Sequence, residues 1–225
     1  MRMLLTSNGI TNPTIRQSLL GLLGKPFDES RVVVILDAFL PFPGDKRTMI
    51  RHVGDLGALG WAELDVLSLF NGPRSLLEPR LLAADVVYCF GGSNHWLAHA
   101  WRSTGYVPLL QEILDEKVYV GMSAGSMIFS RLHEAAVEAE DDHAEIAMFE
   151  LDSVGPALPL FDWFVSCHLG AEWREDPTDE WVIRAAERLG GPLWAIDDDT
   201  ALLVRGPDAE PEVISEGRWL SLPGR

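Results

Sequence analysis

The feature that most constrains the fold is a regular alternation of short apolar runs with longer amphipathic stretches. Three of the runs are rich in β-branched residues and lie at residues 31–36, 85–90 and 117–121. Continuous apolar runs of this length are typical of strands buried on both faces of a parallel sheet. Helical patterns lie between or beside them, at residues 13–23, 45–59, 94–105 and 106–116. The alternation predicts an α/β fold with a doubly wound, mostly parallel sheet and helices on both faces.

The C-terminal part has a different pattern, because its apolar runs are shorter and are separated by glycine and proline. These runs lie at residues 200–206, 212–215 and 218–220. They predict antiparallel strands in hairpins. We expect all three at the edge of the same sheet, since they are too short to bury a core alone. Residues 1–225 are therefore expected to form one domain.

The charge of the chain argues against two classes of partner. Asp and Glu number 34 and Lys and Arg number 18, which gives a formal net charge of −16. A surface of this charge repels nucleic acid and anionic membranes. A small anionic substrate is still compatible with it, because a local arginine can outweigh a field that salt screens over about 8 to 10 Å.

The two cysteines and the first seven residues indicate the cellular compartment in which the protein is expected. Cys89 and Cys167 lack the spacing of a zinc site or of a disulfide framework, so no metal is expected and a reducing compartment is favoured. Residues 1–7 lack the apolar region of a signal peptide, and no later run of about 18 apolar residues occurs. We therefore expect a cytoplasmic protein.

The most informative motif is Gly-x-Ser-x-Gly at residues 121–125. A strand pattern precedes it and an apolar helical pattern follows, which is the context that a nucleophile elbow requires. Gly121 and Gly125 would let the strand and the helix approach closely, while Ser123 would occupy a strained turn. The backbone N–H of Ala124, at the start of the helix, would then stabilise an oxyanion. The pattern predicts Ser123 as a nucleophile.

A second glycine motif, Gly91-Gly92, follows another predicted buried strand and precedes a helical stretch. At the carboxyl end of a parallel strand, such a pair can turn backbone N–H groups toward a ligand. An ordinary strand-to-helix turn uses glycine in the same way, so the pair alone does not distinguish the two. Together with the elbow, it predicts further oxyanion donors.

A serine nucleophile needs a base, and the chain has six histidines: His52, His95, His99, His133, His143 and His168. His168 is favoured because it follows an apolar strand-like run and would lie at the same edge as the elbow. His133 and His143 fall in the charged stretch 131–150, where a solvated helix face is expected. His95 follows the glycine pair and is a candidate for lining a pocket.

The carboxylate that would orient this base has three candidates. Asp197, Asp198 and Asp199 follow a strand pattern at residues 192–196 and precede another one. A tight acidic turn at a strand end can hold an imidazole in its useful tautomer, but Asp is also a common turn former. The residues alone leave the choice open.

Taken together, these motifs resemble the peptidase E family of serine peptidases, which comprises α-aspartyl dipeptidases and their cyanophycinase relatives. The likeness extends from residues 3–9 to residues 196–202 and is strongest over residues 104–128, which contain the elbow. The resemblance implies a flavodoxin-like fold related to class I glutamine amidotransferases. It also implies Ser123 as the nucleophile and His168 as the base.

The resemblance assigns the remaining catalytic groups as well. It implies oxyanion donors at Gly92 and Ala124. Family members carry an acidic residue two positions before a Ser or Thr in the closing segment. Here that Thr is Thr200, so Asp198 is the acid that the resemblance implies.

Substrate contacts are expected from Gly91 and Asn94 in the glycine-rich turn. Aspartyl dipeptidases usually carry an arginine, within a Thr-Arg-Glu-like stretch, that helps to hold the acidic side chain of the substrate. This chain has Asp179 at that point, and Arg174 is the nearby cation that would replace the arginine.

The expected activity is hydrolysis of short peptides, with N-terminal Asp as the candidate first residue, through an acyl-enzyme on Ser123 and without a cofactor. A non-catalytic ligand-binding or regulatory protein of the same fold is the alternative, because a fold does not fix a function. A glutamine amidotransferase is disfavoured, since its nucleophile would be cysteine. The expected partners are a small peptide and, as an open point, a second copy in a homodimer.

Overall fold

The structure of the protein is a computed structural model that describes residues 1–173 and 178–224. Within these residues, the centre of the molecule is a seven-stranded sheet in the order β3-β2-β4-β5-β1-β8-β9. Its strands are β1 (Met3–Thr6), β2 (Arg31–Ile35), β3 (Glu63–Leu67), β4 (Val86–Cys89), β5 (Val118–Met122), β8 (Thr200–Val204) and β9 (Glu212–Ser215). Strands β1 to β5 are parallel to their neighbours among themselves, and β8 and β9 extend the sheet as an antiparallel edge. The predicted α/β fold with a mostly parallel sheet is confirmed.

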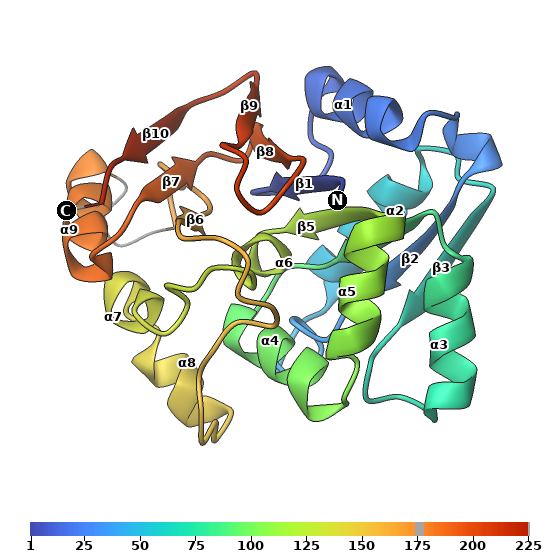
Figure 1. Ribbon diagram of the computed structural model, residues 1–225, viewed down its shortest axis with the longest axis horizontal. Coiled ribbons are helices and arrows are strands. Elements are labelled where there is room, and N and C mark those ends of the chain that lie inside the picture. The colour runs from blue at the N-terminus through green and yellow to red at the C-terminus, as the bar shows by residue number, and fades with distance from the viewer. Residues whose placement is uncertain (174–177, 225) are drawn as a thin grey trace.

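Helices cover both faces of this sheet, as Figure 1 shows. The helices of the described residues are α1 (Pro13–Leu23), η1 (Phe27–Glu29), α2 (Arg47–Gly57), α3 (Arg74–Ala83), α4 (Asn94–Ser103), α5 (Val107–Glu116), α6 (Ala124–Met127), α7 (Ala136–Glu140), α8 (His143–Met148) and α9 (Asp179–Leu189). Of these, α9 lies beside a second, smaller sheet. None of the helices in the described part of the chain is both long enough and apolar enough to span a bilayer.

Side chains alternate between two apolar cores, one on each face of the sheet. In β5, Tyr119 joins the core under α3, α4 and α5, whereas Val118 and Val120 join the core under α1 and α2. Because successive side chains of a strand point to opposite faces, a strand with two covered faces is apolar throughout. This arrangement explains why β2, β4 and β5 are continuous apolar runs.

The first helix illustrates how the sequence sets the bounds of an element. The side chain of Asn12 accepts a hydrogen bond from the backbone N–H of Ile15 at 2.9 Å and caps the start of α1, with Pro13 in the first turn. Gly24 ends the helix in the left-handed conformation, with φ 70°. Both signals are visible in the sequence, and the predicted range 13–23 agrees with the structure.

A second, three-stranded sheet lies beside the first, with the order β10-β7-β6. It contains β6 (Phe164–Ser166), β7 (Leu193–Ile196) and β10 (Trp219–Leu222). The expectation that all three C-terminal runs lie at the edge of the main sheet is therefore wrong for the third. Strand β10 pairs antiparallel with β7, where Trp219 packs against Trp194 with ring centroids 5.8 Å apart. This pairing gives the short strand a partner, β7, whose residues are all buried.

Candidate active site

Ser123 lies in the sharp turn between β5 and α6, at the carboxyl edge of the parallel strands. Its backbone has φ 48° and ψ −114°, a conformation that non-glycine residues rarely adopt. Backbone contacts hold it there: the Ser123 N–H donates to Thr6 O at 2.9 Å, and Ser126 N–H donates to Ser123 O at 2.7 Å. The turn therefore has the strained geometry that presents a side chain at a strand end.

Two glycines make this turn possible because they have no Cβ atom at points where backbone segments lie very close together. A Cβ on Gly121 would lie 2.6 Å from backbone atoms of Gly125. A Cβ on Gly125 would lie 2.2 Å from the carbonyl oxygen of Cys89 on β4. The close approach of strand and helix expected from the motif is present at both positions.

The substitution Gly125→Ala is expected to lower the free energy of unfolding by at least about 3 kcal/mol, because the new methyl group would force β4 and α6 apart. Gly21→Ala on α1 is the matched control, since a Cβ at Gly21 has nothing within 4 Å. The control should stabilise the protein by about 0.5–1 kcal/mol. Urea unfolding of both variants measures the difference, and equal stability of the two would contradict this packing.

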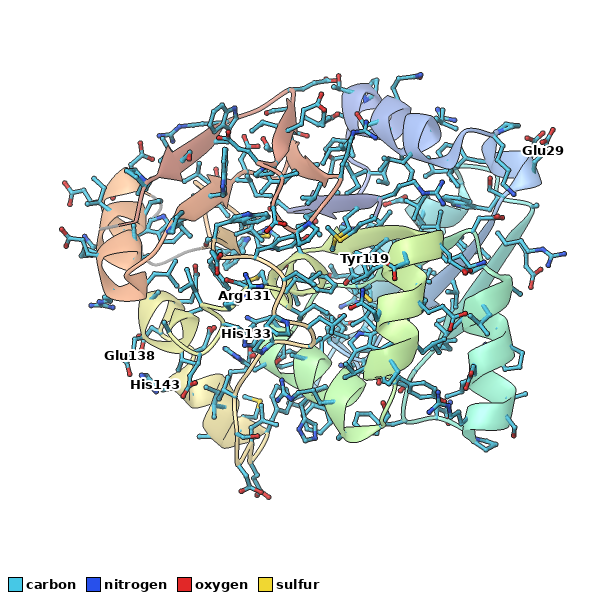
Figure 2. All side chains as sticks on the ribbon, viewed as in Figure 1. Glu29, Tyr119, Arg131, His133, Glu138 and His143 are labelled. Atoms are coloured by element: carbon cyan, nitrogen blue, oxygen red, sulfur yellow. The ribbon has the colours of Figure 1, made fainter. Side chains whose placement is uncertain are left out.

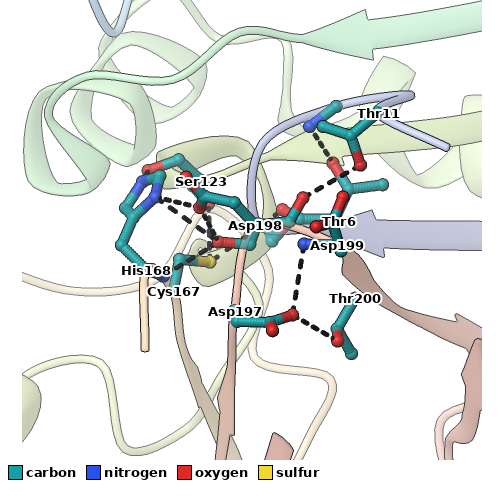
Figure 3. A network of polar contacts seen from close by, with 12 residues as sticks. Thr6, Thr11, Ser123, Cys167, His168, Asp197, Asp198, Asp199 and Thr200 are labelled. Atoms are coloured by element: carbon teal, nitrogen blue, oxygen red, sulfur yellow. Dashed lines mark hydrogen bonds and ion pairs between the residues drawn. The ribbon is translucent and has the colours of Figure 1, made fainter. Parts of the chain in front are cut away.

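His168 and Asp198 approach Ser123 from other loops, as Figure 3 shows. His168 follows β6 in the small sheet, and Asp198 lies in the turn that leads from β7 to β8. His168 Nε2 lies 2.9 Å from Ser123 Oγ, and His168 Nδ1 lies 2.6 Å from Asp198 Oδ1. A continuous chain of polar contacts thus connects the three side chains that the resemblance had singled out.

Ser7, at the end of β1, joins this chain and was not anticipated from the sequence. Its hydroxyl donates to Asp198 Oδ1 at 2.9 Å and accepts the backbone N–H of His168 at 2.8 Å. It therefore ties the carboxylate and the imidazole-bearing residue to the central sheet. The signal that was available was position, since Ser7 follows a buried strand at the same edge.

The environment of Asp198 favours its charged form. Burial raises the pKa of this carboxyl, but the hydrogen bond and the charge of His168, together with the Ser7 hydroxyl, outweigh burial and hold the pKa below its usual value. An ionised carboxylate at Nδ1 keeps the Nε2 atom of the neutral imidazole unprotonated and able to accept a proton from Ser123.

The neighbouring aspartates have other surroundings. Asp197 Oδ1 accepts the Thr200 hydroxyl at 2.6 Å, and its Oδ2 accepts the backbone N–H of Arg218 at 2.5 Å. Asp197 therefore holds the turn and the start of β10. Asp199 is exposed, and its backbone carbonyl accepts a hydrogen bond from Asn12. Of the three candidates, Asp198 is the one whose carboxylate contacts His168.

The glycine pair after β4 lies against the elbow. A Cβ on Gly91 would be 3.2 Å from the Ser123 Cβ, so the turn passes directly beside the serine side chain. Gly92 has φ 133° and packs on the backbone of Ala38, where a Cβ would lie 2.2 Å from the carbonyl oxygen. Ala124 is fully buried at the start of α6. The turn and the elbow therefore present their backbones to the same space.

Asn94 and Arg174 were both expected to contact the substrate, and the structure describes only the first of them. Asn94, the first residue of α4, is only 6% exposed, and its Oδ1 accepts no hydrogen bond within the described residues. Arg174 lies outside the described residues. Trp173 is largely exposed and packs edge-on to His168, with ring centroids 5.3 Å apart, so an aromatic side chain borders the histidine.

The expectation that His133 lies on a solvated helix face is wrong. Its side chain is fully buried, and burial, followed by repulsion from His95 and Arg102, lowers its pKa to about 3. Nearby charged residues in the sequence, including Arg131, Glu134 and Glu138, are exposed, but His133 itself is not. Figure 2 shows His133 inside the molecule and His143 with Glu138 at the surface. There, His143 Nε2 lies 2.9 Å from Glu138 Oε1.

A cavity of about 410 Å³ lies between the loop that follows β1 and helix α2. His52, Asp55 and Tyr88 are among its lining residues, together with the loop after β1. Thr11 in that loop donates its hydroxyl to the backbone carbonyl of Asp198 at 2.9 Å. One lining residue of the cavity therefore contacts the turn that carries the carboxylate.

A doubly wound sheet with a serine, a histidine and a carboxylate joined at its carboxyl edge is an arrangement typical of hydrolytic enzymes. Comparison with known families makes the class specific. The model of peptidase family S51 matches residues 3–211, so the chain belongs to this family and is related to peptidases.

Two solved structures show the same fold over nearly the whole chain. A candidate peptidase E protein from Listeria monocytogenes EGD-e superposes with a TM-score of 0.75 at 20% sequence identity, covering 96% of this chain and 98% of that one. A peptidase from an acI-B1 Actinobacterium gives a TM-score of 0.63 at 18% identity, covering 99% and 94%. A search of curated proteins finds no significant match.

Proposed function

We propose that the protein is a serine peptidase that hydrolyses short peptides through an acyl-enzyme on Ser123. The observation that carries the proposal is the contact chain from Ser123 Oγ through the imidazole of His168 to Asp198, with distances of 2.9 and 2.6 Å. Membership of peptidase family S51 supports the reaction class. The strained turn at Ser123 supports the choice of nucleophile.

The reaction begins when His168 Nε2 accepts the proton of the Ser123 hydroxyl and the serine oxygen attacks the peptide carbonyl. The carbonyl oxygen becomes an oxyanion, and the resulting tetrahedral intermediate collapses as His168 gives the proton to the leaving amine. Water, activated by the same imidazole, then releases the acid product. Asp198 holds the Nδ1–H tautomer and stabilises the imidazolium that forms in each half.

Donors for the oxyanion come from the turns on either side of the serine. The Ser123 N–H is already bonded to Thr6 O, so it does not serve this purpose. We assign the role to the backbone N–H groups of Gly92 and Ala124, because Gly91 lies against the serine side chain and Ala124 follows it directly. Fixed backbone donors of this kind stabilise developing charge without reorganisation.

The proposal is tested by labelling with a fluorophosphonate probe, which reacts with activated serines, and by mapping the modified peptide with mass spectrometry. We expect one label per chain at Ser123 and loss of peptide hydrolysis in the labelled protein. Absence of labelling in a folded sample would contradict the proposal and would favour a non-catalytic binding protein. Labelling at another serine would show that this other serine, and not Ser123, is the nucleophile.

We propose dipeptides that begin with Asp as the substrate class. A substrate carboxylate needs a cation in the pocket, and a bidentate arginine provides it most effectively. Two arginines elsewhere in the chain are engaged: Arg16 lies over the ring of Phe27, and Arg47 pairs with Asp45. Arg174 directly follows Trp173 in the sequence, and Trp173 packs against His168, so we expect a preference for Asp to depend on Arg174.

Arg174→Ala is expected to lower kcat/KM for an Asp-initiated dipeptide by about 10- to 100-fold, the usual effect of losing a charge-assisted contact, and to leave a Leu-initiated dipeptide unchanged. Matched Asp-, Asn- and Leu-initiated dipeptides measure this selectivity, with Arg16→Ala as the control variant. A strong Asp preference that survives Arg174→Ala would show that another cation holds the substrate.

A further inference from the structure

The glycine turn beside Ser123 leads directly into a buried serine, Ser93, which caps the start of α4. The Ser93 N–H donates to Ala38 O at 2.9 Å, and Ser93 Oγ accepts the backbone N–H of Trp96 at 2.9 Å. The hydroxyl therefore acts as an acceptor for the helix, and its own proton is free to be donated elsewhere.

That proton goes to a carboxylate from a distant part of the chain. Ser93 Oγ donates to Glu145 Oε1, and Glu145 lies on α8, 52 residues further along. Burial raises the pKa of Glu145, while the bond from Ser93 opposes this change. Placing a carboxylate away from water is unfavourable unless it is hydrogen-bonded, so the contact with Ser93 is a specific one.

A second contact joins the same two segments. His95 Nε2 lies 3.0 Å from Asp142 Oδ2, and the His95 side chain is fully buried. Asp142 directly precedes α8, so both acidic groups reach from one short segment to the first turn of α4. The buried ring of His133 packs edge-on to His95, with centroids 4.8 Å apart, and fills the space behind it.

Residues 143–148 of α8 contribute little apolar burial. None of its residues is fully buried, and Met148 is 56% exposed. Two polar contacts, from Asp142 and Glu145, join this segment to the start of α4. Phe149, at the end of α8, adds an apolar contact with Trp96, with ring centroids 5.2 Å apart. A helix that only filled space would bury its apolar side, whereas this one directs its carboxylate at the residue that follows Gly92.

We propose that Glu145 is a positioning residue that fixes the Gly91–Gly92 turn beside Ser123 through its hydrogen bond with Ser93. The inference rests on the proposed function, since the turn matters for catalysis because it supplies an oxyanion donor. Two adjacent glycines have wide backbone freedom, and a donor displaced by about 1 Å loses much of its effect. The carboxylate restrains the turn without touching the substrate.

The test compares Glu145→Ala, Glu145→Gln, Ser93→Ala and the Glu145→Ala/Ser93→Ala double variant. The rate constant for labelling of Ser123 by a fluorophosphonate is the first measurement, because its phosphonyl oxygen occupies the oxyanion position. We expect Glu145→Ala and Ser93→Ala each to slow labelling by about 10- to 100-fold, below the effect of removing a donor outright. Glu145→Gln keeps an acceptor oxygen and should stay within about threefold of the wild type.

The double variant separates positioning from general stability. If both residues act through one bond, the double variant should label no slower than the slower single variant, within about threefold. Glu138→Ala removes an exposed carboxylate in the middle of α7, is the control for charge removal and should label at the wild-type rate. Multiplicative losses in the double variant, or loss of labelling in Glu145→Gln, would overturn the inference.

Hydrogen exchange of a peptide covering residues 90–97 provides a readout that does not depend on activity. Exchange should be faster in Glu145→Ala and Ser93→Ala and unchanged in Glu145→Gln. Unchanged exchange in Glu145→Ala would overturn the inference even if no substrate were hydrolysed. If the wild type were not labelled at all, the proposed function would fail, while exchange would still decide the role of Glu145.

Discussion

Ser123→Ala is expected to abolish peptide hydrolysis, with turnover lowered by about 10⁴- to 10⁶-fold, because it removes the attacking oxygen. The fold should persist, since the turn is held by the backbone bonds of Ser123 to Thr6 and Ser126 and not by the hydroxyl. The expected result is a variant with wild-type thermal unfolding and no fluorophosphonate label. Turnover is measured with the best dipeptide substrate of the wild type.

Ser126→Ala is the matched control, because it removes another hydroxyl from the same turn. Ser126 Oγ donates to Thr6 O at 2.8 Å, so its loss should lower stability by about 1 kcal/mol and leave most of the turnover. Retention of more than a tenth of wild-type activity by Ser123→Ala would remove Ser123 from the role of nucleophile.

Asp198→Asn is expected to lower turnover by about 10⁴-fold, as in other enzymes where the carboxylate of such a triad is made neutral. An amide at this position can donate a hydrogen bond to His168 Nδ1, which favours the tautomer with its proton on Nε2. A protonated Nε2 cannot accept the proton of Ser123. KM should change little, because the carboxylate does not face the substrate. Steady-state kinetics on folded protein separates the two parameters.

The adjacent aspartates are controls with different expectations. Asp199→Asn should retain wild-type turnover, since its side chain is exposed. Asp197→Asn should lower the melting temperature, because its carboxylate holds Thr200 and the backbone of Arg218, with a smaller effect on turnover. A larger loss of turnover in either control than in Asp198→Asn would show that the wrong acid has been assigned.

The parallel sheet could be predicted because strands covered on both faces have apolar runs that need no partner to be recognised. Strand β3 was not predicted, and its position explains why: it lies at the edge of the sheet, and Glu63 with Asp65 interrupts its pattern. Strand β10 was assigned to the wrong sheet. Its sequence shows that it is a short strand, but its choice of β7 as a partner depends on long-range packing.

The candidate site shows the same division between local and distant information. The elbow at Ser123 is local, because a strand, two glycines and a helix lie within a few residues of each other. His168, Asp198 and Ser7 come from three separate turns, and no spacing in the chain relates them. His133 was misinterpreted because neighbouring charged residues in the sequence, such as Arg131, Glu134 and Glu138, are exposed while His133 itself is buried. The catalytic roles of Ser123, His168 and Asp198 are predictions that the variants above test.

The arrangement of the two sheets has a consequence for how the protein is made. The nucleophile turn is complete once residue 125 has been synthesised, but the histidine follows β6 and the carboxylate lies between β7 and β8. Strand β8 also covers the open side of β1, so the central sheet has an unpaired edge until residue 204 is available. Chains fold during synthesis from the N-terminus onward. If Ser123, His168 and Asp198 act as proposed, a nascent chain on the ribosome carries its nucleophile long before it can cut a peptide bond, and activity begins only when the segment through residue 204 has emerged.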